Sequence, residues 1–227
     1  MVFDASAVVY GESIKNRNNS GRTIPMSMAG GERISLQLSS SLDLLSNAMW
    51  KPSLPPDVKD PMLAEKYVLD AVITDPAVIQ TIRALDQRNL DYCVVNSAAL
   101  FGQELTADAL RAIYMPIIKT RDGVEFVRLR IPLANGLADK TAVIVVDSDE
   151  GGVIAWHTGT VEKDIDRGSK FVAVVEAYGM YLIRPNNVGM TLTLTNIMVW
   201  PGSAGAAATG VGRFQFEGVR FTETTFD

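Results

Sequence analysis

The sequence has 227 residues, of which 47% are hydrophobic and 21% charged, and its formal net charge at pH 7 is −5. This composition is too apolar for a disordered chain and is ordinary for a globular protein with a sizeable core. The negative net charge excludes a strongly basic nucleic-acid binder. It permits binding to a polyanion but does not indicate it. The longest aliphatic run, residues 142–146, is far shorter than the ~20 residues that cross a bilayer. The first residues lack a basic stretch followed by an apolar one, so we expect no secretory signal and no membrane span.

Residues 1–32 are predicted to form an N-terminal arm at the surface. The stretch from Asn16 to Arg22 consists of polar and turn-forming residues, which favour loops. After Gly30 and Gly31, apolar residues alternate from Arg33 to Leu38, and this period predicts a half-buried strand. The main domain is therefore expected to begin at residue 33 and to extend to residue 200.

Residues 41–114 are predicted to be a helical insertion in that domain. Asp75 and Pro76 form a good helix start, because Asp can cap the first turn and Pro loses no hydrogen bond there. The apolar residues that follow fall on one helical face: Val78, Ile79, Ile82 and Leu85. Thr106 is predicted to cap a second helix.

From Met115 onward the sequence is predicted to form a sheet. Strands are expected at Val124–Ile131, Thr141–Asp147, Val153–Trp156, Lys170–Tyr178, Met190–Trp200 and Arg213–Phe221. Several short strands at this spacing indicate a small closed barrel or a sandwich. The expected fold is thus mainly β with a helical insertion (α+β), and residues 201–227 are expected to be a Gly/Ala-rich linker and a tail.

The usual catalytic and metal-binding patterns are missing from the sequence. Cys93 is the single cysteine and lies in an apolar run, so we expect a core thiol. His157 is the single histidine and follows Trp156 at a strand end, where a surface position is the simpler interpretation. The C-terminal glycines lack the Gly-Lys-Ser/Thr of a phosphate-binding loop. We therefore predict no enzymatic activity, no cofactor and no metal.

One predicted strand has a composition suited to nucleic acid. Between Val124 and Ile131, alternation places Val127, Leu129 and Ile131 on one face and Phe126, Arg128 and Arg130 on the other. A ring and two guanidinium groups in line suit base stacking and phosphate pairing, although an ordinary solvated face has the same pattern. Further candidates for nucleic-acid binding are Lys119, Arg121, Trp156, Arg167, Lys170, Tyr178 and Tyr181.

The order of these segments resembles a known family. Thr141–Asp147 is a valine-rich strand ending in aspartate, Gly168-Ser169-Lys170 opens the next strand, and Val188–Val199 alternates from a glycine to an apolar end. This order is similar to that of the single-stranded DNA-binding proteins of podophages and their relatives in large DNA viruses. The resemblance covers roughly residues 115–200.

The resemblance implies an OB-fold, a five-stranded barrel with an open face for single-stranded nucleic acid, with helices inserted near the barrel's start. It also implies an acidic C-terminal tail with a terminal aromatic residue that docks on replication proteins. The corresponding residues here are Glu223, Phe226 and Asp227.

The leading hypothesis is a sequence-tolerant single-stranded DNA-binding protein of viral or phage DNA replication or recombination, acting inside the host cell. A viral capsid or virion component with a β-sandwich is the alternative, and a carboxylate-and-metal nuclease is a third. Preference for DNA over RNA and homo-oligomer formation stay open.

Overall fold

The computed structural model describes residues 4–16, 21–40, 66–133, 138, 140–150, 153–165, 169–183, 187–200, 215–216 and 219–220. In this part of the chain twelve strands form one mixed sheet: β1 (Val8–Tyr10), β2 (Ile14–Lys15), β3 (Arg22–Met28), β4 (Ile34–Ser40), β5 (Lys66–Val72), β6 (Tyr114–Met115), β7 (Ile118–Arg121), β8 (Val124–Pro132), β9 (Ala142–Glu150), β10 (Val153–Gly159), β11 (Lys170–Ile183) and β12 (Asn187–Trp200). A separate pair consists of β13 (Gln215–Phe216) and β14 (Val219–Arg220). The helices are η1 (Ala5–Ala7), α1 (Pro76–Val95), α2 (Ser97–Phe101), α3 (Ala107–Ile113) and α4 (Val161–Asp164).

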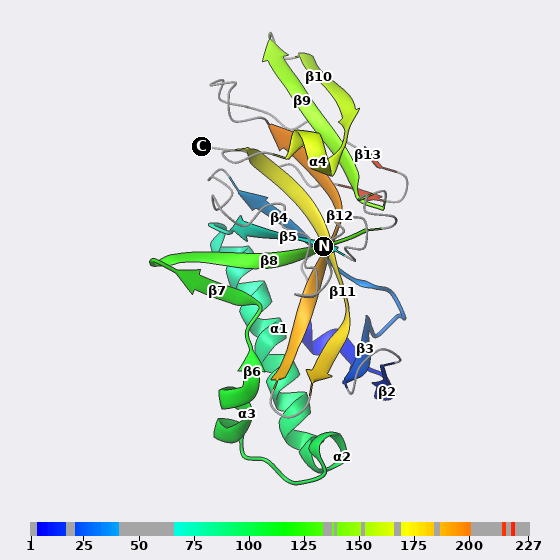
Figure 1. The fold of residues 1–227 in the computed structure, drawn as a ribbon, viewed down its shortest axis with the longest axis vertical. Coiled ribbons are helices and arrows are strands. Elements are labelled where there is room, and N and C mark those ends of the chain that lie inside the picture. Colours follow the sequence, from blue (N-terminus) through cyan, green and yellow to red (C-terminus); the bar gives the residue numbers. More distant parts are fainter. Residues whose placement is uncertain are drawn as a thin grey trace, which may run out of the picture.

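The long antiparallel pair β11 and β12, of 14 residues each, forms the middle of the sheet (Figure 1). The other edge of β11 pairs antiparallel with β4 and β3. The other edge of β12 pairs in parallel with β6, β8 and β9 in turn, and β8 pairs in addition with β5 and β7. Figure 1 shows the β9–β10 hairpin standing out at one end of the molecule and α1, α2 and α3 towards the other.

Strand β8 has an apolar side and a polar side. On β8, Val127, Leu129 and Ile131 have no exposed surface, whereas the alternating Arg128 and Arg130 are exposed. This is the alternation predicted from the sequence. The apolar face packs in one core with the buried side of α1, from which Ile82, Leu85 and Cys93 enter the same cluster.

The helix starts predicted from the sequence are confirmed. The Asp75 carboxylate accepts a hydrogen bond from the amide of Ala77, and Pro76 occupies the first turn of α1. At α3, the Thr106 hydroxyl accepts a hydrogen bond from the amide of Ala109. Cys93 lies buried in the core, as expected, and burial raises the pKa of its thiol to about 12.

The prediction of a mainly β protein with a few helices is confirmed, but the closed five-stranded barrel is wrong. The described strands run in the order β1-β3-β11-β12-β8-β5, and the two end strands, β1 and β5, do not pair with each other. A barrel requires its edges to join. The sheet that these residues form is therefore open.

Three further segments differ from the sequence-based expectation. The N-terminal segment contributes β1, β2 and β3 to the main sheet, and Ile24 of β3 is fully buried. Within the expected helical insertion, residues 66–72 form β5, while residues 41–65 lie outside the described part. The strand expected at 213–221 is instead the short pair β13 and β14. Among the described helices, none is both long enough and apolar enough to cross a bilayer.

Candidate nucleic-acid interface

Six strands of the main sheet, β4, β5, β7, β8, β11 and β12, carry more positive than negative side chains. Within their bounds lie six Lys and Arg residues and three Asp and Glu residues. Each of the three carboxylates is ion-paired with an arginine: Asp70 with Arg121 and Arg128, Glu125 with Arg83, and Glu176 with Arg33. These strands therefore have an excess of positive charge even though the whole chain is acidic.

A cavity of about 190 Å³ opens where β12 passes from its pairing with β6 to its pairing with β8. Strands β5, β7, β8, β11 and β12 and the β6–β7 turn all contribute to its wall. Among the described residues, four cationic side chains line it and no Asp or Glu does. The lining residues are Lys66, Val68, Met115, Pro116, Ile117, Lys119, Arg128, Leu129, Arg130, Tyr181, Met190 and Thr191.

A buried carboxylate fixes Arg128 at this cavity. Asp70 lies directly opposite Arg128 in the β5–β8 register and has no exposed surface. Its two carboxylate oxygens accept hydrogen bonds from Arg128 Nε at 2.7 Å and Nη2 at 2.8 Å, a bidentate geometry. Arg121 Nη2 donates to Asp70 Oδ2 at 3.3 Å. The hydrogen bond with Asp70 raises the pKa of Arg128, so this guanidinium stays charged and is held in place.

Lys119 lies on β7 beside Arg128 and is half-buried. Burial lowers the pKa of its ammonium group and the positive charge of Arg128 lowers it further, while the negative charge of Asp70 opposes both effects in part. The charged form of Lys119 is therefore less favourable here than in water. An anion in the cavity would offset this cost.

Lys66 and Arg130 complete the cationic lining from neighbouring strands. Arg130 lies opposite Val68 on β5 and opposite Thr193 on β12, and its side chain is exposed. No Asp or Glu among the described residues forms an ion pair with either cation.

Phe126 does not provide the exposed stacking surface that the sequence predicted. It shares a face with Arg128 and Arg130, but only 3% of its surface is exposed. It lies between Lys119 on β7 and Val72 on β5, and the guanidinium of Arg121 stacks over its ring at 5.1 Å from the centroid. The β7–β8 hairpin thus covers the ring, and alternation along one strand could not show this.

Tyr181 is the predicted aromatic residue that does line the cavity. It is partly buried, and this burial raises the pKa of its hydroxyl. Gly189 lies opposite it in the β11–β12 register, and a Cβ atom at Gly189 would be 2.6 Å from the Tyr181 hydroxyl oxygen. Because glycine has no side chain, position 189 leaves room for the Tyr181 hydroxyl.

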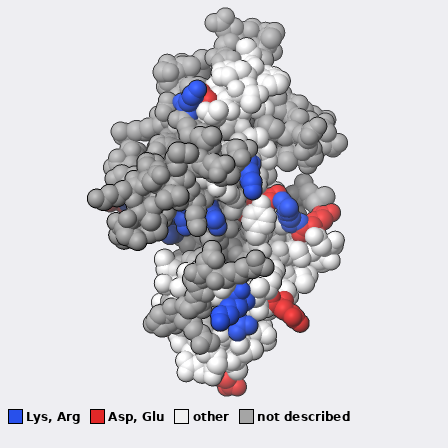
Figure 2. Space-filling view, turned by 45° about the vertical axis from the view of Figure 1, so that its right-hand side comes forward, with Lys and Arg blue, Asp and Glu red and all other residues white. Residues whose placement is uncertain are grey.

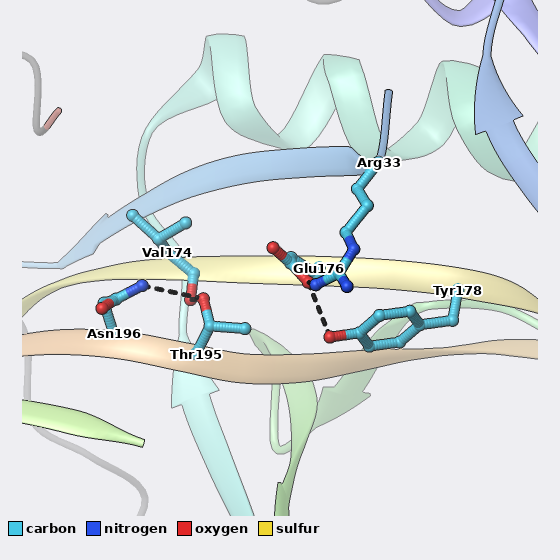
Figure 3. Close-up of polar contacts among 6 residues, drawn as sticks. All are labelled: Arg33, Val174, Glu176, Tyr178, Thr195 and Asn196. Carbon is cyan, nitrogen blue, oxygen red and sulfur yellow. Dashed lines mark hydrogen bonds and ion pairs between the residues drawn. The ribbon is translucent and has the colours of Figure 1, made fainter. Parts of the chain in front are cut away.

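Tyr178 lies on β11 but is not among the residues that line the cavity. The ring is 47% exposed, its hydroxyl donates to Glu176 Oε2 at 2.6 Å, and the Arg33 guanidinium lies 5.5 Å from its centroid. Figure 3 shows the Tyr178 hydroxyl turned towards Glu176 and Arg33 reaching the same carboxylate. An exposed face of this ring can stack, but its neighbourhood already holds a carboxylate.

The remaining predicted residues are not brought to the cavity. Trp156 is 52% exposed on the β9–β10 hairpin, and β9 joins β12 only at Asn196–Val199. Lys170 pairs with Trp200 at the far end of β12, roughly 30 Å from Met190 at about 3.3 Å per residue. Four predicted positions lie outside the described residues: Arg167, Glu223, Phe226 and Asp227.

Sequence reasoning missed Lys66 and Asp70. A signal for Asp70 was present, because a single aspartate inside the apolar run from Tyr67 to Val72 indicates a buried carboxylate that needs a partner. For Lys66 no local signal exists, since its role depends on the pairing of β5 with β8.

A buried polar network supports the cavity from the apolar side. Asp86 of α1 accepts a hydrogen bond from the Tyr114 hydroxyl at 2.7 Å and another from the amide of Ile117 at 3.0 Å. Asn89 donates to the same Tyr114 hydroxyl and accepts from that of Tyr10. Since Ile117 lines the cavity, this network fixes one of its walls to α1.

The charges on the side of the molecule drawn in Figure 2 form small separate groups of Lys and Arg, some with Asp or Glu beside them. Among the described residues on that side, these groups do not join into a broad basic surface. Among the described residues no cluster of three or more His, Cys, Asp or Glu could hold a metal ion.

No protein-family model matches the sequence, and no curated protein matches it either.

Proposed function

We propose that this chain binds single-stranded DNA without sequence preference, through the cationic cavity beside the polar side of β8. The observation that carries the proposal is the convergence of Lys66, Lys119, Arg128 and Arg130 with Tyr181 around one cavity. Cationic grooves with aromatic side chains are the usual means of binding an unpaired strand. The proposed role is in viral or phage DNA replication or recombination, and it does not require a closed barrel.

The first test is an anisotropy titration with a labelled single-stranded oligonucleotide at several salt concentrations. Each neutralised phosphate contributes a slope of about −0.7 in log K against log[salt], so binding is expected to weaken as the salt concentration rises. Absence of binding at low salt, or an affinity independent of salt, would refute the proposal. Large assemblies in light scattering that ignore added oligonucleotide would favour a structural virion component instead.

The variants that test the cavity are Arg130→Ala and Lys66→Ala. Both side chains lack a described carboxylate partner, so their removal is expected to leave stability intact and to weaken binding roughly tenfold. The exposed Lys163 on α4 gives a matched control, because Lys163→Ala removes a cation outside the cavity. Arg128 is unsuitable for this test, since Arg128→Ala would also leave the buried Asp70 without its main partner.

A further inference from the structure

The positive charge at the cavity is concentrated at one point, whereas a strand lying across the sheet would spread its negative charges. Asp70 compensates Arg128, but Lys66, Lys119 and Arg130 have no carboxylate partner among the described residues. Three cations that form no ion pair with a described carboxylate therefore line one small space. A single internal phosphodiester, with one negative charge, would neutralise only part of this charge.

Lys119 strengthens this argument, because it is half-buried and next to the fixed Arg128. Its pKa is lowered by burial and by that neighbouring charge, with Asp70 opposing the shift in part. The charged form of Lys119 is therefore less favourable in this cavity than in water. A ligand with more than one negative charge offsets this cost better than a monoanion does.

The size of the cavity limits what can enter it. Its volume of about 190 Å³ is below the ~300–1,000 Å³ of pockets for drug-sized ligands. A phosphate group fits such a volume.

Resting on the proposed function, we propose that the cavity binds the terminal phosphate monoester of a DNA strand in preference to an internal phosphodiester. A monoester carries about −1.5 to −2 charges at pH 7 and presents three acceptor oxygens. Lysine ammonium groups and a guanidinium supply donors for each of these oxygens. The protein would then hold strand ends more tightly than strand interiors.

The test compares three oligonucleotides of one short sequence with a 5′-phosphate, a 3′-phosphate or only hydroxyl ends, by competition against a labelled hydroxyl-ended strand. We expect at least one phosphorylated strand to bind about tenfold more tightly than the hydroxyl-ended strand, as one added charge-assisted contact would give. Added inorganic phosphate should abolish this preference at an ionic strength at which chloride does not.

The preference should disappear in Lys119→Gln and in Lys66→Gln and persist in the remote control Lys163→Gln. Lys66 provides the second variant in case Lys119→Gln, at a half-buried position, fails to fold as judged by circular dichroism. Equal, salt-dependent binding of all three oligonucleotides would overturn this inference and leave the proposed function standing. Binding of none of them would overturn both.

Discussion

At Asp70, a carboxylate with no exposed surface is shared by two arginines that are each 45% exposed. A buried charge is costly unless it is paired and hydrogen-bonded, and Asp70 accepts three hydrogen bonds from Arg128 and Arg121. The pairing therefore both keeps β5 joined to β8 and positions a guanidinium at the cavity.

Asp70→Asn is expected to lower the free energy of unfolding by about 1.5–3 kcal/mol, since it weakens hydrogen bonds between charged partners. Urea denaturation measures this. Asp108→Asn is the control, because Asp108 forms an ion pair with Arg111 at the surface and its side chain is 93% exposed. An unchanged unfolding midpoint for Asp70→Asn would show that the two arginines need no buried anion.

Asp86 predicts a dependence of stability on pH. Burial raises the pKa of this carboxyl from its ordinary 3.8 to about 6, against the opposing hydrogen bonds from Tyr114 and Ile117. Between these two values the folded protein holds a proton that the unfolded chain has lost, so this contribution to stability decreases as pH rises. Relative to Asp86→Asn, the wild type should gain about 2 kcal/mol between pH 7 and pH 4.5, at about 1.4 kcal/mol per unit.

Denaturation curves of both proteins at pH 4.5, 5.5 and 7 measure this difference. Taking the difference between the two proteins removes the contributions of all other carboxyl groups. A difference that stays constant over this range would mean that Asp86 is ionised throughout in the folded protein.

At the scale of single elements, β11 depends on a local irregularity. Its pairing with β12 shifts register between Ala177 and Met180, and Gly179 in this segment lies against β3. A Cβ atom at Gly179 would be 2.3 Å from the carbonyl oxygen of Ile24, a contact that no real structure tolerates. Close approach of β3 to β11 therefore requires glycine here.

Gly179→Ala is expected to destabilise the protein by about 1–3 kcal/mol, because β3 must move away from β11. Gly30→Ala is the matched control, since a Cβ atom there meets nothing within 4 Å. Thermal unfolding of both variants gives the comparison. Equal melting temperatures would indicate that β3 can separate from β11 at no cost.

How far sequence reasoning succeeded varies from element to element. The alternation on β8 and the caps of α1 and α3 are local patterns, and they were predicted correctly. The alternation of Ile24, Met26 and Met28 on β3 was also visible, but the polar residues before it suggested an arm.

The candidate site was only partly predictable, because tertiary contacts determine it. Lys119, Arg128, Arg130 and Tyr181 were among the predicted residues and do line the cavity. The burial of Phe126 under Arg121 depends on how β7 folds against β8, which no single-strand pattern contains.

For the whole molecule, stability is expected to be uneven. β11 and β12 pair with strands on both edges, whereas β10 pairs only with β9 among the described strands. Local opening costs least where few contacts hold an element. Native-state hydrogen exchange should therefore show the slowest amides in the middle of β11 and β12 and much faster ones in β10. Similar protection in both places would mean that the hairpin opens only with global unfolding.

The pairing of β4 with β11 has a consequence for folding of the nascent chain during translation. Arg33 and Glu176 are 143 positions apart, so the amino-terminal strands leave the ribosome long before the segment that completes their hydrogen bonding exists. Such non-local topology slows folding and leaves strand edges open to aggregation in the meantime. Synthesis in a cell should consequently benefit from chaperones that hold the early strands until translation reaches residue 183.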